Sequence, residues 1–274
     1  MTVTSIAPAR PAAYKVTGAR VLRAEWAKFW SLRSSWITLS VAVFLLVLFG
    51  TIASYTYTAG AAAGGPPGRS GGDSDAVSLA LTGVTFASLA VGVLGVLLSA
   101  GEYSTGMIRS TLTAVPRRLP VLWAKAAVIG PIALVLATLG ALAAFGLGSP
   151  GLDGEKISLS LGDDGVLRSL AGAGLYLGLV AVFGVALGVL LRNSAGAIAS
   201  LVGILLILPG LATLLPDSWY DTLSPYFPSN AGQAVYALHQ SSDALSPGAG
   251  LAVFAGWVAL TLAGAAYRLV RTDV

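Results

Sequence analysis

The sequence predicts an all-α membrane protein, in which an interfacial amphipathic elbow helix precedes six transmembrane helices and short outer re-entrant helices join spans five and six. Three observations predict this fold class. Of the 274 residues, 55% are hydrophobic and only 10% are charged, whereas a soluble domain typically carries about 25% charged residues. Six apolar runs are long enough to cross a hydrocarbon core of about 30 Å. Basic residues gather in alternate connections between those runs.

The N-terminal region divides into two segments of different character. Residues 1–15 are rich in Pro, Ala and Thr without periodicity, which predicts a disordered cytoplasmic tail. Residues 16–35 place apolar and basic side chains at helical spacing, as in helices that lie in the membrane interface. A plain positively charged flank is the alternative. The interface residues expected in this elbow helix are Arg23, Trp26, Lys28, Phe29 and Arg33.

The apolar runs predict six spans within one transmembrane domain over residues 36–271. A cleaved signal peptide is the rival reading of the first run, but the segment before it is long for an n-region. Pro131 and the pair Pro209-Gly210 predict bends. Glycine pairs at 174/178 and 184/188 permit close helix packing. The expected spans are residues 36–57, 77–100, 126–147, 168–191, 195–215 and 250–267.

Residues 101–125, GEYSTGMIRSTLTAVPRRLPVLWAK, form the charged interlude around which the chain is organised. They contain four basic residues and one acid, Glu102. A polar stretch between two membrane-length runs is expected in water on one face of the bilayer, and the basic excess assigns it to the cytoplasm. The basic residues of the interlude are Arg109, Arg117, Arg118 and Lys125.

Charge placement predicts the topology of the whole chain. With both termini and the connections after spans two and four in the cytoplasm, that side holds 13 Lys/Arg and three acids. The outer connections then hold three basic residues and nine acids. This asymmetry is a strong positive-inside signature. It explains the basic pI of about 9.5 without any nucleic-acid partner.

The long connection before the last span, residues 216–247, is rich in aromatic residues. We expect short helices there that dip into the outer interface. Ser229 and Asn230 are expected to cap a helix over residues 231–238. Ala231, Ala234, Val235 and Leu238 share one face of that helix.

Several classes of function are disfavoured by the residues present. The chain has no cysteine and a single histidine, so thiolate sites and histidine-cluster metal sites are excluded, and no catalytic or metal-binding residues are expected. No GxxxxGK[ST] motif occurs. The cores of the expected spans lack ionisable residues, which disfavours a self-powered secondary transporter. If the protein performs transport work, the energy must therefore come from a partner.

The elbow segment VLRAEWAKFWSLRSSW together with GEYSTGMIRSTLTAVPRRLPVLWAK resembles the ABC-2 type permease family, and most closely the short versions found beside a separate ATPase gene in actinobacteria. The later YFPSNAGQAV resembles the family's outer re-entrant segment, where it supplies Tyr226, Phe227, Pro228 and Asn230. The resemblance extends over residues 20–271. Where the family loop often has a threonine after the glycine, this chain has Met107.

The resemblance implies a transmembrane subunit of an ATP-driven exporter in the bacterial cytoplasmic membrane. Two permease chains, as a homo- or heterodimer, would each dock an ATPase subunit that holds ATP-Mg, so this chain would bind no cofactor and would not itself be an enzyme. The substrate would be hydrophobic or amphiphilic, namely a drug, antibiotic, lipid or peptide, at residues still unknown. The expected ATPase-coupling residues are Glu102, Gly106, Arg109, Pro116, Arg117 and Arg118.

Glu102 is expected to pair with Arg109 or with an arginine of the elbow, and Arg117 and Arg118 are expected to contact the ATPase. Topology-setting charge is the alternative role of those two arginines. Two further classes of function remain open on the sequence. One is a permease-like membrane anchor of a sensing or resistance complex without transport. The other is a self-contained carrier or channel.

Overall fold

The computed structural model describes residues 16–57, 75–240 and 244–271. The expected tail at 1–15 lies outside the described residues, as does most of the glycine-rich loop before the second span. Within the described ranges every regular element is helical and no strand occurs. Short helices separate or precede the spans: α1 (Gly18–Ser31), α3 (Ala76–Ala80), α5 (Met107–Ala114), α10 (Asp217–Leu223) and α11 (Pro228–Tyr236).

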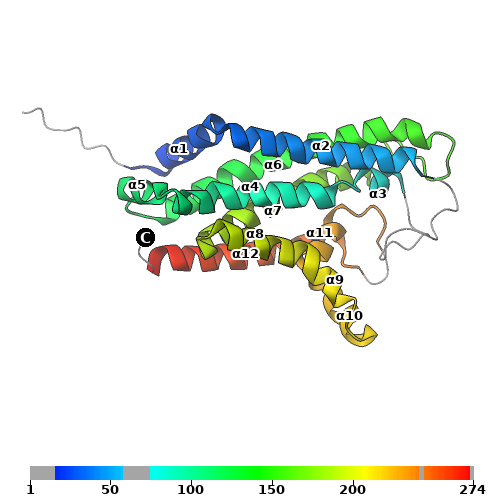
Figure 1. Cartoon of the computed structure of the whole chain (residues 1–274). Helices are drawn as coiled ribbons and strands as arrows, with labels where there is room; N and C mark the ends of the chain where they lie inside the picture. The colour runs from blue at the N-terminus through cyan, green and yellow to red at the C-terminus, as the bar shows by residue number, and fades with distance from the viewer. Residues whose placement is uncertain (1–15, 58–74, 241–243, 272–274) are drawn as a thin grey trace, which may run out of the picture.

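Among the described residues, six helical segments are long and apolar enough to cross a bilayer, which confirms the all-α membrane fold. They run side by side along one axis (Figure 1). In chain order they are α2 (Arg33–Tyr55), α4 (Val84–Ser104), α6 with the 3-10 turn η2 (Leu119–Leu152), α7 (Val166–Leu191), α8 to α9 (Ser194–Ala212) and α12 (Pro247–Arg271).

Helix α7 is the central element of the bundle and packs against α4, α6 and α12. In its apolar stretch 72% of the residues are buried, against 28% in α2 and in α12. Glycines permit the approach of its neighbours, since a Cβ built on Gly184 would lie 2.2 Å from the Gly92 carbonyl oxygen of α4. One on Gly174 would meet Leu134 and Thr138 of α6. The glycine pair at 174 and 178 therefore packs against α6, and the pair at 184 and 188 packs against α4.

Spans two and three differ from the expected boundaries. The run from residue 77 breaks into α3, which Asp75 caps by accepting a 2.6 Å hydrogen bond from the Ser78 amide, and into α4, which begins at Val84 and continues to Ser104. Helix α6 begins at Leu119, with Pro120 in its first turn, rather than at residue 126. Most of the 101–125 interlude is therefore helical, because a chain near the bilayer satisfies its amides internally.

The fifth span bends where its backbone ladder changes. Residues Gly203–Ile207 form the π-helical turn η3, in which the Leu208 amide donates to the Gly203 carbonyl oxygen, and Pro209 follows without an amide hydrogen. Beyond the bend, α9 (Leu208–Ala212) and α10 leave the bundle as a projecting arm (Figure 1). The expected bend at Pro209-Gly210 thus begins a turn earlier.

Helix α11 packs against α7 and α12, toward the end of the bundle opposite α1 and α5 (Figure 1). It begins at Pro228 with Phe227 as its cap, so Ser229 and Asn230 do not cap it as expected. The Asn230 side chain instead donates to the carbonyl oxygen of Ser224, in the turn η4 (Ser224–Tyr226). The shared apolar face is confirmed for Ala231, Ala234 and Val235, which are all buried. Leu238 does not belong to it, because α11 ends at Tyr236 and Leu238 lies beyond the helix, half-buried.

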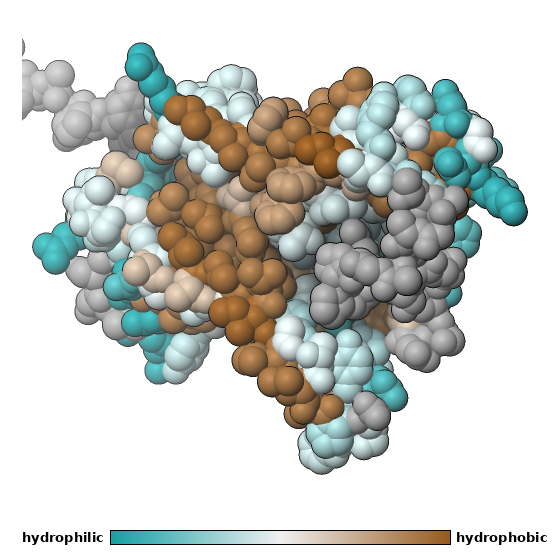
Figure 2. All heavy atoms as spheres, turned by 45° about the vertical axis from the view of Figure 1, so that its right-hand side comes forward, coloured by the Kyte–Doolittle hydropathy of each residue, from teal (hydrophilic) through white to brown (hydrophobic). Residues whose placement is uncertain are grey.

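The surface carries the apolar area that a bilayer requires. Figure 2 shows a continuous hydrophobic surface that runs over the bundle and onto the projecting arm, with hydrophilic residues toward its margins. Leucine side chains of the arm are strongly exposed, and that of Leu214 retains 81% of its accessible area. Such a surface is stable against lipid and not against water.

We expect the Gly184→Ala variant to be destabilised by about 1–3 kcal/mol, because the new methyl group overlaps the α4 backbone. Intrinsic tryptophan fluorescence during thermal unfolding in detergent measures the loss. Gly256→Ala is the matched control, since nothing lies within 4 Å of its Cβ and alanine is the better helix former. Equal melting temperatures for the two variants would contradict the packing described here.

Candidate functional site

The candidate site lies at the end of the bundle where three separate parts of the chain meet. Helix α1, helix α5 and the C-terminal end of α12 all lie at this end, on the left in Figure 1. The sequence predicts that this end faces the cytoplasm, because its connections are the basic ones. Helix α11 lies toward the opposite end (Figure 1), so the predicted re-entrant residues in it and directly before it, among them Tyr226 and Pro228, do not join the site.

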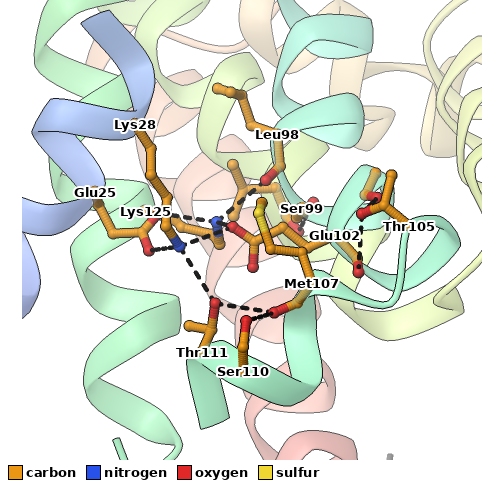
Figure 3. Close-up of polar contacts among 12 residues, drawn as sticks. Glu25, Lys28, Leu98, Ser99, Glu102, Thr105, Met107, Ser110, Thr111 and Lys125 are labelled. Atoms are coloured by element: carbon orange, nitrogen blue, oxygen red, sulfur yellow. Dashed lines mark hydrogen bonds and ion pairs between the residues drawn. The ribbon is translucent and has the colours of Figure 1, made fainter. Parts of the chain in front are cut away.

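A network of four charged side chains forms the core of this site (Figure 3). The Lys125 ammonium of α6 donates to Glu102 of α4 at 2.6 Å and to Glu25 of α1 at 2.8 Å. The Lys28 ammonium of α1 donates to the same two carboxylates, at 2.8 Å to Glu25 and 3.1 Å to Glu102. We call these four residues the charge network. Each cation bridges both anions, so three helices are joined.

Three members of the charge network are buried. The side chains of Glu25, Glu102 and Lys125 keep 5–7% of their accessible area, whereas Lys28 keeps 30%. Buried charges are tolerated when they are paired and hydrogen-bonded. The network contains two positive and two negative groups and is neutral overall. Lys125 gains a third acceptor in the Leu98 carbonyl oxygen at 3.2 Å, and one buried oxygen of Glu102, Oε2, has no protein partner.

The protonated form of Lys28 is stabilised by its neighbours. Burial acts to lower the pKa of this ammonium group, but the hydrogen bonds and charges of Glu25 and Glu102 outweigh burial and raise its pKa above the ordinary value of 10.5. Lys28 is therefore a permanent cation at any physiological pH. Its ammonium also lies 3.4 Å from the Thr111 hydroxyl of α5, which brings a fourth helix to the network.

Helix α1 is positioned by one stripe of residues that faces the bundle. Val21, Glu25 and Phe29 are spaced four apart, are all buried, and lie on the side of α1 that packs against α6. Phe29 therefore lies in the protein core rather than in the membrane interface as expected, and Lys28, which is 30% exposed, pairs with two carboxylates. Arg23, Arg33 and Trp26 are exposed, as expected for an interfacial helix.

The partners of Glu102 differ from the expectation. Glu102 pairs with two lysines, Lys28 of the elbow and Lys125, and not with Arg109, whose side chain is exposed. Lys125 was expected in the water-exposed interlude, but α6 carries it to a buried position. The reason is geometric, since the early start of α6 places Lys125 nearly two turns inside the helix.

Helix α5 is seated on the bundle by its inner face. Ile108 is 4% exposed, and it lines a small cavity with Leu112, between residues of α4, α6, α7 and α12. Gly106 permits the sharp entry into α5, because its φ of 73° lies in the left-handed region. The residues that line this cavity are Ser99, Tyr103, Ile108, Leu112, Val121, Leu122, Lys125, Val189 and Leu269.

The outer face of α5 and the turn after it are open to solvent. Arg109, Pro116 and Arg117 are exposed, and Met107 keeps 44% of its accessible area. Arg118 differs from these residues. Its guanidinium donates to the Leu269 carbonyl oxygen of α12 at 3.1 Å, so it ties the start of α6 to the last span.

Two more arginines close this end of the bundle. Arg192 follows the last residue of α7 in the left-handed conformation. Its guanidinium donates a hydrogen bond to the Arg268 carbonyl oxygen at 3.2 Å, and the Arg268 guanidinium donates one to the Leu190 carbonyl oxygen. The Arg192 guanidinium also lies 5.4 Å from the centre of the Tyr103 ring. Cations on helix C-terminal carbonyls are favoured by the helix dipole. This group holds α7 and α12 together beside the charge network.

Glu25 and Lys125 are the site residues that sequence reasoning missed. The sequence signal for Glu25 was its position four residues from both Val21 and Phe29, which puts an acid on the apolar stripe of an amphipathic helix. Among the described residues no group of three or more His, Asp or Glu side chains gathers as a metal site. A comparison with known families and curated proteins gives no match of either kind.

We expect Lys125→Met to destabilise the protein by about 3–5 kcal/mol, because it leaves two buried carboxylates on the single cation Lys28. Adding Glu102→Gln restores the charge balance and should recover most of the loss. Lys156→Met, at an exposed lysine, should change the stability by less than about 0.5 kcal/mol. Melting temperatures measured by thermal unfolding in detergent compare the stabilities of these three variants. A Lys125→Met variant as stable as Lys156→Met would contradict the network.

Lys28 also yields a pH prediction. A raised folded pKa contributes stability that is fully present below the unfolded value of 10.5 and is lost as pH rises through the folded value. The difference in melting temperature between the natural chain and Lys28→Met should therefore be constant from pH 6 to pH 9. We expect it to correspond to about 1–3 kcal/mol. A difference that disappears within that pH range would show that Lys28 does not act as a cation here.

Proposed function

We propose that this chain is the transmembrane permease subunit of an ATP-driven exporter of the ABC-2 type. The observation that carries the proposal is the way in which α5 is attached to the bundle. This short helix is exposed on one face. On the other it lines a cavity together with residues of α4, α6, α7 and α12, and its Thr111 contacts Lys28 of α1. A surface helix built in this way transmits a push from a partner to several membrane spans at once.

The contacts suggest how such a push travels. Displacement of α5 acts on α6 and α7 through Ile108 and Leu112, which are packed at the small cavity. It acts on α1 through the contact between Thr111 and Lys28. The charge network then couples α1, α4 and α6, because a buried ion pair that separates leaves uncompensated charges. The spans would therefore move together between discrete arrangements rather than one at a time.

The energy source in this proposal is a separate ATPase subunit. The full sequence contains no P-loop motif, so ATP hydrolysis is assigned to the partner. The exposed cations Arg109 and Arg117 fit an acidic edge on that partner. Arg118 is less suited to the contact role expected from the sequence, because it already donates to Leu269.

The substrate is proposed to be hydrophobic or amphiphilic and to leave outward. The interior of the bundle between α2, α4, α6 and α7 is lined by aliphatic side chains such as Leu46, Val91 and Leu136, which offer no charged contact to a polar solute. A second permease chain completes the transporter in this proposal. The bacterial cytoplasmic membrane is the compartment that the charge pattern and the family resemblance favour.

The test is co-expression with the products of neighbouring genes, purification of the tagged chain in detergent, and an ATPase assay of what is retained. We expect a P-loop subunit to co-purify and Arg109→Glu with Arg117→Glu to abolish its retention, because charge reversal repels an acidic edge. Arg271→Glu, at an exposed arginine of the same end, is the matched control and should retain the partner.

A second variant separates binding from coupling. Glu102→Gln removes one anion of the charge network, which leaves α5's exposed face intact. We expect the ATPase subunit to be retained while substrate-stimulated ATP hydrolysis falls about five- to tenfold, within the usual range of coupling energies. Glu102→Gln with Lys125→Met restores the charge balance and serves as the control for loss of stability.

Two outcomes would replace the proposal. If the chain purifies alone and moves solute in liposomes without an ATPase, it is a self-contained carrier. If the partner binds but no substrate changes its ATP hydrolysis, the chain is a membrane anchor for a sensing or resistance complex.

A further inference from the structure

Helix α1 presents a row of aromatic rings on the side that does not pack against the bundle. The Trp26 and Trp30 rings lie 5.8 Å apart between centroids, and Trp30 continues to Trp36 of α2 at 4.3 Å. We call these three residues the aromatic stripe. Trp26 and Trp30 remain about half exposed, at 47% and 52%. Packing against the rest of the protein therefore leaves about half of each of these two residues uncovered.

The structure sorts the charges of α1 so that the aromatic stripe is flanked only by arginines. Glu25, the single acid of α1, faces the bundle and is neutralised by Lys28 and Lys125. Lys28 is committed to the same network. Arg23 lies three and seven residues before Trp26 and Trp30, hence on the same helical face, and is exposed, as is Arg33 between Trp30 and Trp36.

The stripe ends where the lipid-facing surface begins. Trp36 lies in the first turn of α2, and the residues that follow on the exposed face of α2 are Ile37, Val41 and Phe44, each at least 45% exposed. At a rise of about 1.5 Å per residue, Trp36 is then at the edge of the hydrocarbon core and Arg33 about one turn outside it. That depth is the headgroup layer.

We propose that the aromatic stripe with Arg23 and Arg33 is a binding site for anionic phospholipid in the leaflet at this end of the bundle. A guanidinium forms paired, charge-assisted hydrogen bonds with a phosphate, and its planar geometry suits that group better than an ammonium does. Indole rings bury their apolar body among the upper acyl chains and keep the N–H toward the headgroup. The inward orientation of Glu25 removes the one side chain that would repel an anion.

Selectivity for anionic over zwitterionic phospholipid follows from this charge pattern and not only from the position of the helix in the interface. A zwitterionic headgroup offers a phosphate but carries its own cation, whereas phosphatidylglycerol leaves the phosphate charge unopposed. Each basic residue near an anionic surface contributes about 1 kcal/mol, which is about a fivefold preference, so two arginines correspond to an enrichment on the order of tenfold or more. This site does not depend on the proposed exporter function, since it requires only a bilayer.

The experiment uses the full chain in nanodiscs of phosphatidylcholine and phosphatidylglycerol in a 4:1 ratio, in which the acyl chains of one lipid or the other are brominated. Bromine quenches tryptophan fluorescence at short range, and subtracting the signal of a Trp26→Phe/Trp30→Phe/Trp36→Phe variant isolates the aromatic stripe from the other tryptophans. We expect brominated phosphatidylglycerol to quench the stripe severalfold more than its mole fraction predicts, and added salt to reduce the excess.

The controls make the assignment specific. Arg23→Gln with Arg33→Gln should reduce the quenching to the mole-fraction value. Arg109→Gln with Arg117→Gln removes the same charge from the same end of the bundle but away from the stripe and should leave the excess unchanged. Quenching in proportion to mole fraction in the natural chain, or an equal loss in both double variants, would overturn the proposal. If Arg23→Gln/Arg33→Gln folds poorly, Arg23→Lys/Arg33→Lys keeps the charge and should lower the excess only in part.

Discussion

The pairing of buried charges is the constraint on which this end of the molecule depends. Two carboxylates and the Lys125 ammonium are buried beside the partly exposed Lys28, and the buried charges are tolerable only while the network stays paired and neutral. Because the four groups come from α1, α4 and α6, no one of these helices can shift alone without exposing a charge to an apolar environment. The network therefore makes their arrangement discrete rather than continuously adjustable.

Around that network the structure places two kinds of contact with different mechanical properties. The glycine-mediated packing of α7 against α4 and α6 brings backbone to backbone and forms a rigid centre. The contacts of α5, by contrast, are made by side chains and include two aliphatic residues at a small cavity and the polar contact between Thr111 and Lys28. A short helix attached through side chains beside a rigid centre is where an external force is most readily received, and the exporter proposal rests on this contrast.

The same network also determines what α1 shows to its surroundings. Since Glu25 and Lys28 neutralise their charges inward, the charges left on the exposed surface of the helix are all positive, and they lie beside exposed tryptophans. In the lipid-site proposal, protein and lipid contacts are thereby separated on opposite sides of one short helix. At the other end of the bundle the fifth span departs from its neighbours at the π-turn before Pro209, and it carries an apolar arm whose exposed leucines are suited to lipid.

The sequence by itself determined the class of the protein. Six apolar runs, few charges and an asymmetric distribution of arginine and lysine are local or additive properties, so they can be read without knowing any contact. The amphipathic α1 and the buried face of α11 were predictable for the same reason, because they follow from helical periodicity.

The partners of individual charges were decided only by tertiary structure. Glu25, Glu102 and Lys125 are separated by long stretches of chain, and no local pattern states that α1 lies across the start of α6. The early start of α6 converted an expected loop lysine into a buried bridge, and a turn at residues 81–83 divided an apolar run that looked continuous. Long-range pairing depends on the relative placement of helices, which the packing of glycine and bulky side chains sets and which periodicity along one helix does not encode.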